Sequence, residues 1–101
     1  MVKNLRRVIW DKTAAENLRE IYRYIKKDSP DAALKVKREI FSVTTKLASH
    51  PEMFAADTLK ENNDGSYRAF FIYSYRIAYK ITEDSILILR IRHTSREPEE
   101  Y

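Results

Sequence analysis

A single stretch decides the fold: residues 75–96, YRIAYKITEDSILILRIRHTSR. Its two ends are rich in β-branched and aromatic residues, and the polar residues 82–85 separate them as a short turn separates two strands. Ile86–Leu89 is apolar at every position, which is typical of a strand that is buried on both faces in the middle of a sheet. The sequence therefore predicts an antiparallel meander with strands at about Tyr67–Ile72, Tyr75–Ile81 and Ile86–Arg92.

The residues before this meander predict a short strand and a first helix. Leu5–Trp10 alternates in the way that a strand with two different faces requires. Thr13 and Glu16 then form a capping-box pattern, so we expect a helix to begin there and to end near Lys26.

A second helix is predicted from Ser29 to about Leu47. Ser29 suits the cap, Pro30 suits the first helical position, and apolar residues follow at spacings of three and four. Helices joined by so few residues pack antiparallel. The predicted fold is therefore one α+β domain over residues 1–101, in the order β-α-α-β-β-β, with a helical hairpin packed on a mostly antiparallel sheet.

The composition excludes several classes of function. The chain has 101 residues, no cysteine and only two histidines, which excludes disulfides and thiol catalysis and predicts neither a metal site nor a cofactor. No apolar run approaches the roughly 20 residues that span a bilayer, and residues 1–10 lack the apolar core of a signal peptide. We therefore expect a cytoplasmic protein with no membrane partner.

Positive charge is distributed unevenly along the chain. The net charge is +4, and eight of the nine lysines lie at or before Lys60. Residues 67–101 instead carry five arginines, namely Arg68, Arg76, Arg90, Arg92 and Arg96. Because arginine forms planar, bidentate contacts with phosphate or carboxylate, any anion-binding surface is expected in the second half.

Three parts of the chain carry a resemblance to a known family. Asp28–Ala33 and Leu47–Pro51 bound the second helix, Tyr75–Ile81 reads Tyr-Arg-apolar-x-Tyr, and Ile86–Arg96 is a strand followed by His-x-x-Arg. In this order they resemble the RelE/ParE toxins of type II toxin–antitoxin systems, over most of the chain. The resemblance implies a growth-inhibiting plasmid-stabilisation toxin, a cognate antitoxin that wraps around it, and operator DNA bound only through the antitoxin complex.

The family acts in two ways. ParE-like members poison DNA gyrase, whereas RelE-like members are mRNA interferases that cut messenger RNA in the ribosome. The Pro-Asp-Ala-Ala opening of the second helix, the long hairpin and the His-x-x-Arg tail resemble the ParE-like branch more, so gyrase inhibition is the favoured prediction. A metal-independent endoribonuclease is the alternative, and an inactive relative that only binds its antitoxin is a third, so enzymatic activity is left open.

Candidate catalytic residues follow from the RelE-like resemblance. RNA cleavage needs a base, an acid and cations that stabilise the charge on the phosphate. Arg76 matches the arginine that contacts the scissile phosphate, and His93 matches an acid or base. Arg96 and Tyr101 would complete the set. The alternatives are an Arg76 paired with a carboxylate and a His93 hydrogen-bonded at a strand end.

A surface for nucleic acid or a target is predicted around Arg68, Arg90, Arg92 and Tyr75. Arg68 departs from the RelE-like pattern, which has lysines in this strand. Tyrosines between arginines suit base stacking, and they equally suit a sheet core. We expect Arg76, His93 and Arg96 to gather in one shallow, positively charged hollow opposite the helices.

Overall fold

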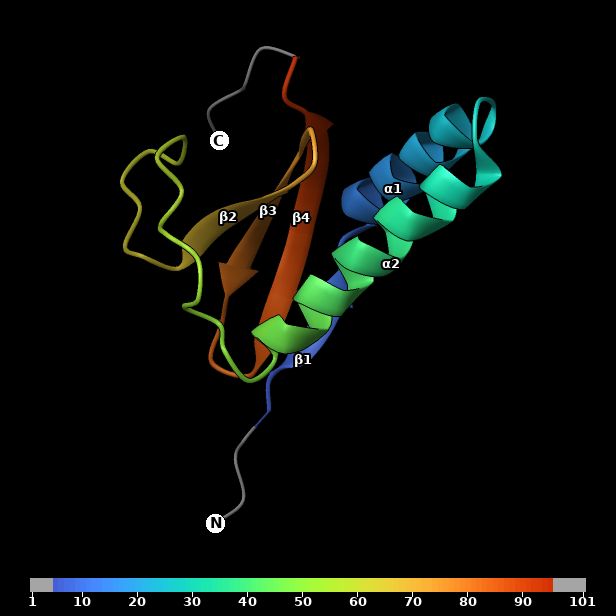
Figure 1. The fold of residues 1–101 in the computed structure, drawn as a ribbon. Coiled ribbons are helices and arrows are strands. Elements are labelled where there is room, and N and C mark those ends of the chain that lie inside the picture. The colour runs from blue at the N-terminus through green and yellow to red at the C-terminus, as the bar shows by residue number, and fades with distance from the viewer. Residues whose placement is uncertain (1–4, 96–101) are drawn as a thin grey trace.

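The molecule is a helical hairpin packed on a single sheet (Figure 1). A computed structural model describes residues 5–95. In chain order the elements are β1 (Arg7–Trp10), α1 (Lys12–Lys26), α2 (Pro30–Leu47), β2 (Tyr67–Ile72), β3 (Tyr75–Ile81) and β4 (Ser85–His93). This is the predicted order, so the predicted fold class is confirmed.

The first helix begins at a different cap from the one predicted. Asp11 is the N-cap of α1, and its carboxylate accepts a hydrogen bond of 3.0 Å from the backbone N–H of Thr13. The prediction that Thr13 caps this helix was therefore wrong. The aspartate stands two residues earlier, where its side chain reaches a free N–H of the first turn.

The second helix begins as predicted. The hydroxyl of Ser29 accepts a hydrogen bond of 3.1 Å from the N–H of Ala32, and Pro30 is the first helical residue. Both helices lie against the same face of the sheet, with α1 packed on α2 and on β4 (Figure 1). Within residues 5–95, no helix is long and apolar enough to cross a membrane.

The sheet has the strand order β1-β4-β3-β2. β1 runs parallel to β4, and the three later strands form the predicted antiparallel meander. β4 is therefore a middle strand, as predicted. Its burial is one-sided, however: Ile86 and Ile88 are fully buried, whereas Leu87 and Leu89 are only half-buried. The prediction of burial on both faces was wrong because helices cover only one face (Figure 1).

The core lies between the helices and the face of the sheet that they cover. Tyr79 is the largest of its fully buried side chains, and its hydroxyl donates a hydrogen bond of 2.8 Å to the carbonyl of Pro51. The other buried apolar residues of this core are Ala14, Leu18, Val36, Ile40, Leu47, Phe70, Tyr75, Ile77, Ile86, Ile88 and Ile91.

A β-bulge in β4 decides which side chains reach each face. Tyr79 pairs with Ile88 and Ala78 pairs with Arg90, so no residue of β3 lies opposite Leu89. Strict alternation from Ile88 would have turned Arg90 toward the core. The extra residue reverses the alternation. Ile91 therefore faces the helices and is 3% exposed, while Arg90 faces the side without helices.

The connection from α2 to β2 is irregular, as predicted, and is held by side chains. Asn63 is central to it. Its amide donates to the carbonyls of Asp57 and Tyr67, and its side-chain oxygen accepts from the N–H groups of Gly65 and Tyr67. Gly65 has φ +96°, a left-handed conformation that favours glycine. The connection is thereby fixed beside β2.

Candidate functional site

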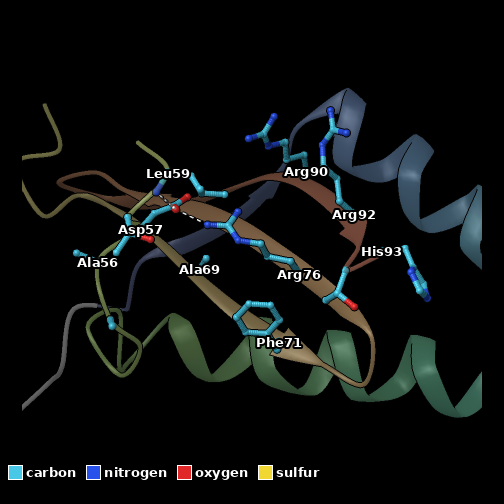
Figure 2. A pocket seen from close by; sticks show the side chains of 12 residues that line it. Ala56, Asp57, Leu59, Ala69, Phe71, Arg76, Arg90, Arg92 and His93 are labelled. Atoms are coloured by element: carbon cyan, nitrogen blue, oxygen red, sulfur yellow. Dashed lines mark hydrogen bonds and ion pairs between the residues drawn. The ribbon is translucent and has the colours of Figure 1, made fainter. Parts of the chain in front are cut away.

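Three arginines lie on the face of the sheet that the helices leave uncovered. Arg76 pairs directly with Arg92 across β3 and β4, and Ala78 pairs with Arg90, so the register puts all three guanidinium groups on one face. They border a cavity of about 370 Å³, which we call the arginine hollow (Figure 2). Its lining residues are Ala55, Ala56, Asp57, Thr58, Leu59, Ala69, Phe71, Arg76, Arg90, Arg92, His93 and Thr94.

Arg76 is paired with a carboxylate at the edge of this hollow. Its guanidinium donates to Oδ1 of Asp57 and forms an ion pair with it, as Figure 2 shows. The side chain of Asp57 is 0% exposed and that of Arg76 is 15% exposed. The same carboxylate oxygen accepts a hydrogen bond of 2.9 Å from the N–H of Leu59. The pair thus fastens the connection between α2 and β2 to the centre of the sheet.

Asp57 was missed by the sequence analysis. It is one acidic residue in an irregular segment, and no spacing or motif distinguishes it from Asp64 nearby. The alternative stated for Arg76, an arginine paired with a carboxylate, is the arrangement found. The partner itself needed the structure.

Arg68 lies apart from the arginine hollow. It pairs across the sheet with Tyr79, and so belongs to the opposite face from Arg76. Its Nε donates to the carbonyl of Gly65 at 2.9 Å and its Nη1 to the carbonyl of Phe54 at 2.7 Å. These bonds hold the irregular connection in place. The expectation that Arg68 lies together with Arg90 and Arg92 was therefore wrong.

His93 and Tyr75 also lie on the helix side of the sheet. They pair directly across β3 and β4, and their rings meet edge to face with centroids 5.3 Å apart. Figure 2 shows the ring of His93 at the far end of the hollow from Asp57, while the guanidinium of Arg76 turns toward Asp57. The expectation that Arg76 and His93 gather in one hollow is therefore confirmed in part: both line the arginine hollow, but they lie toward opposite ends of it. The pairing explains this separation: His93 lies opposite Tyr75, Arg76 lies opposite Arg92, and adjacent pairs point to opposite faces of the sheet.

A second cavity lies between α1 and the end of β4. We call it the helix-side groove, and it has a volume of about 460 Å³. Its lining residues are Asn17, Glu20, Ile21, Tyr24, Tyr75, Ile91, Arg92, His93 and Ser95. The side chain of Asn17 accepts a hydrogen bond of 3.0 Å from the N–H of Ile91. This bond gives a partner to a backbone N–H of β4 that lies beyond the end of β1, whose last residue pairs with Ile88.

The tyrosines of the sheet pack inside the protein, which favours the sheet-core interpretation over base stacking. Tyr79 is fully buried, and desolvation raises the pKa of its hydroxyl to about 12. Burial also raises the pKa of Tyr75 above its ordinary 10.0, and the nearby Tyr24 adds to this shift. Tyr67 packs under two ammonium groups, with Nζ of Lys60 4.8 Å and Nζ of Lys80 5.0 Å from its ring centroid.

Arg96 and Tyr101 lie outside the described residues, so their predicted roles stay predictions. In the part of the chain that the structure describes, no three histidine, aspartate or glutamate side chains form a group that could hold a metal ion.

Comparison with known proteins identifies relatives of the whole domain. Residues 8–98 match the family model described as the ParE toxin of the type II toxin-antitoxin system, parDE. A protein of Sinorhizobium fredii (strain NBRC 101917 / NGR234), named "Putative toxin Y4kP", is 30% identical over 92 residues, which cover 91% of this chain and 92% of that protein.

Solved structures share the fold at lower identity. A chain of a chromosomal ParDE toxin–antitoxin system from P. aeruginosa has a TM-score of 0.68 at 21% identity and covers 90% of this chain and 98% of its own. A chain of the RelBE2 toxin–antitoxin complex from Mycobacterium tuberculosis has a TM-score of 0.57 at 17% identity, with 94% and 98% covered.

The helical hairpin over a mixed four-stranded sheet is the fold that this chain shares with the chains of these two toxin–antitoxin structures. Because the family match spans residues 8–98 and the Sinorhizobium relative is similar over nine-tenths of both chains, this chain belongs to the ParE toxin family of type II toxin–antitoxin systems.

Proposed function

We propose that this toxin inhibits growth by binding DNA gyrase and blocking it, without cutting RNA. We also propose that a cognate antitoxin neutralises it, as in the ParDE and RelBE2 systems to which its fold is similar. Both partners would meet it in the cytoplasm. The observation that carries the proposal is the ion pair between Arg76 and Asp57.

That ion pair occupies Arg76, which is the best candidate for a phosphate contact. A phosphate that claimed Arg76 would have to separate it from a carboxylate whose side chain is 0% exposed. Removing one partner of a buried pair costs about 3–5 kcal/mol, because the other charge is left uncompensated. In a site that binds a scissile phosphate, such a guanidinium would be accessible to the phosphate and not paired with a buried carboxylate.

The position of His93 supports the same conclusion. Metal-free RNA cleavage needs a proton-transfer group and cations at one phosphate. In this sheet Arg76 pairs with Arg92, and the next pair along the two strands is Tyr75 with His93. Adjacent pairs present their side chains to opposite faces. The imidazole and the Arg76 guanidinium therefore leave the sheet on opposite faces, although both residues border the arginine hollow.

The arginine hollow itself suits a protein partner. Arginine and aromatic side chains are the residues most enriched in protein interfaces. Phe71, which is 62% exposed, and the small side chain of Ala69 line the same cavity as Arg90 and Arg92, across the middle strand β3. An apolar floor with cations at its rim matches an interface that combines apolar anchors with acidic side chains.

The endoribonuclease alternative rests on one observation. Three arginines on one uncovered face make a surface that also attracts a phosphate backbone. The inactive relative is the remaining alternative. Activity assays distinguish all three.

The direct experiment measures plasmid supercoiling by purified gyrase with the purified toxin. We expect the wild type to inhibit supercoiling, and Arg92→Ala to weaken inhibition roughly tenfold, since arginine is enriched among the few residues that dominate an interface and tenfold corresponds to about 1.4 kcal/mol. The matched control is Arg38→Ala, an exposed arginine on α2, which should change inhibition less than about twofold. Supercoiling that is unaffected by wild type, with transcripts cut in a translating extract, would establish the nuclease instead.

A further inference from the structure

The environment of His93 fixes which of its ring nitrogens carries the proton. Nδ1 of His93 lies 3.0 Å from the backbone nitrogen of Ser95, and the geometry is that of an N–H donating to the ring. The hydroxyl of Ser95 lies 2.7 Å from the same nitrogen. A backbone N–H is always a donor, so Nδ1 must be an acceptor.

The tautomer follows from the chemistry of imidazole. A neutral ring has one N–H and one acceptor nitrogen. With Nδ1 accepting from Ser95, the proton is on Nε2, which lies on the side of the ring away from Ser95. The serine hydroxyl then donates to Nδ1 as well. The ring thus presents a hydrogen-bond donor rather than a basic nitrogen.

The residue that carries this donor lines the far end of the arginine hollow and also the helix-side groove. His93 lines this groove together with Tyr24, which is 70% exposed, and with Ile21 from α1. Tyr75 packs against the ring edge to face and limits its rotation. Both the tautomer and the orientation of the imidazole are therefore set before any partner arrives, which lowers the entropic cost of binding.

We infer that Ser95 is a positioning residue that holds His93 as an Nε2–H donor, and that His93 uses this donor to bind a carbonyl or carboxylate oxygen of the toxin's target protein. The second part rests on the proposed function, in which the target is gyrase. His93 then acts as a recognition residue and not as a proton acceptor. The helix-side groove becomes a second target contact that adjoins the arginine hollow, since Arg92 and His93 line both cavities.

The first test is NMR of the toxin alone, with ¹H–¹⁵N correlations through the imidazole rings at a pH where they are neutral. His50 is an internal comparison, since its Nδ1 lies 2.9 Å from the hydroxyl of Ser49, and among residues 5–95 no backbone N–H donates to this ring. We expect His93 to be almost entirely the Nε2–H tautomer. Ser95→Pro, which removes both donors, should raise the Nδ1–H population about fivefold, whereas Ser95→Ala keeps the backbone donor and should change it less.

The Nδ1–H tautomer as the major form of wild-type His93, or no change in Ser95→Pro, would overturn the role of Ser95. Neither result depends on gyrase. The test of the tautomer is therefore separate from the test of the proposed function.

The second test compares three variants of His93 in the supercoiling assay. The amide nitrogen of His93→Gln reaches toward the position of Nε2 and can donate, whereas His93→Asn and His93→Ala leave that position empty. We expect Asn and Ala to weaken inhibition about tenfold and Gln to restore at least a threefold part of the loss.

Three equally inactive variants would indicate proton transfer and overturn the donor role. Three variants as potent as wild type would overturn the contact itself. Retained co-purification with the antitoxin shows that each variant is folded. A wild type that does not inhibit gyrase at all refutes the proposed target, and with it the target contact, while the NMR result still decides the role of Ser95.

Discussion

Replacing the two members of the ion pair between Arg76 and Asp57 should have unequal effects on stability. Arg76→Ala leaves a carboxylate whose side chain is 0% exposed without its counter-charge, so we expect a loss of about 3–5 kcal/mol. Asp57→Asn leaves a guanidinium that is 15% exposed at the edge of the arginine hollow and can turn toward water. It also keeps an oxygen for the N–H of Leu59, so we expect a loss of only about 1–2 kcal/mol.

The double variant makes this prediction sharper. In Arg76→Ala with Asp57→Asn no charge is left buried, so the double variant should be more stable than Arg76→Ala alone by roughly 2 kcal/mol. Urea unfolding of the four proteins measures these differences from the midpoint at constant slope. Arg38→Ala, at an exposed position, is the control and should stay within about 0.5 kcal/mol of wild type.

Equal and additive losses below about 1 kcal/mol would refute the reasoning, because they would mean that the pair contributes no coupling. The size of the expected loss also affects how toxicity data are interpreted. A small domain has only about 5–15 kcal/mol of total stability, so Arg76→Ala can lose toxicity by unfolding. Arg92→Ala, outside that pair, is the better probe of the arginine hollow.

Three further predictions concern the fold. Burial raises the pKa of the Tyr79 hydroxyl from 10.0 to about 12, so the free energy of unfolding should be constant below about pH 10 and fall by about 2–3 kcal/mol as the pH rises to about 12. Urea unfolding across that range measures this fall, which should be absent in Tyr79→Phe. Deleting Leu89 should remove the bulge yet leave the pairing of β3 with β4 and every face unchanged, so circular dichroism should show a folded protein, whereas deleting Ile91, which is 3% exposed, turns an arginine toward the helices in its place and should unfold it. Asp11→Ala should lower the thermal midpoint by the equivalent of about 1 kcal/mol and Thr13→Ala by much less; the reverse order would restore the original capping assignment.

The sequence was sufficient for the order of elements and the middle position of β4. These depend on periodicity, on Ser29-Pro30 and on an apolar run at Ile86–Leu89, and such patterns follow directly from how helices and strands bury one face. The cap of α1 was misassigned by two residues because Asp11 and Thr13 are both good caps, and only the path of the chain after β1 decides between them.

The candidate site was only partly predictable, and one residue explains much of the difference. Leu89 looks like its apolar neighbours, so nothing in the sequence marks it as the extra residue of a bulge. Because the bulge leaves Leu89 out of the pairing, Arg90 and Arg92 face the uncovered side and His93 faces the helix side. Asp57 was unpredictable for another reason, since its role arises from contact between an irregular segment and a strand nineteen residues later. Patterns of local period carry no information on such contacts.

The central claim is that this ParE-family toxin acts through a protein surface and not by cleaving RNA. It is tested most directly by one induced culture that expresses the toxin without antitoxin, in which reporter-plasmid topology and the 5′ ends of transcripts are measured together. We predict relaxed or broken plasmid DNA with transcripts intact. Supercoiled plasmid together with new 5′ ends inside translated regions would contradict the account.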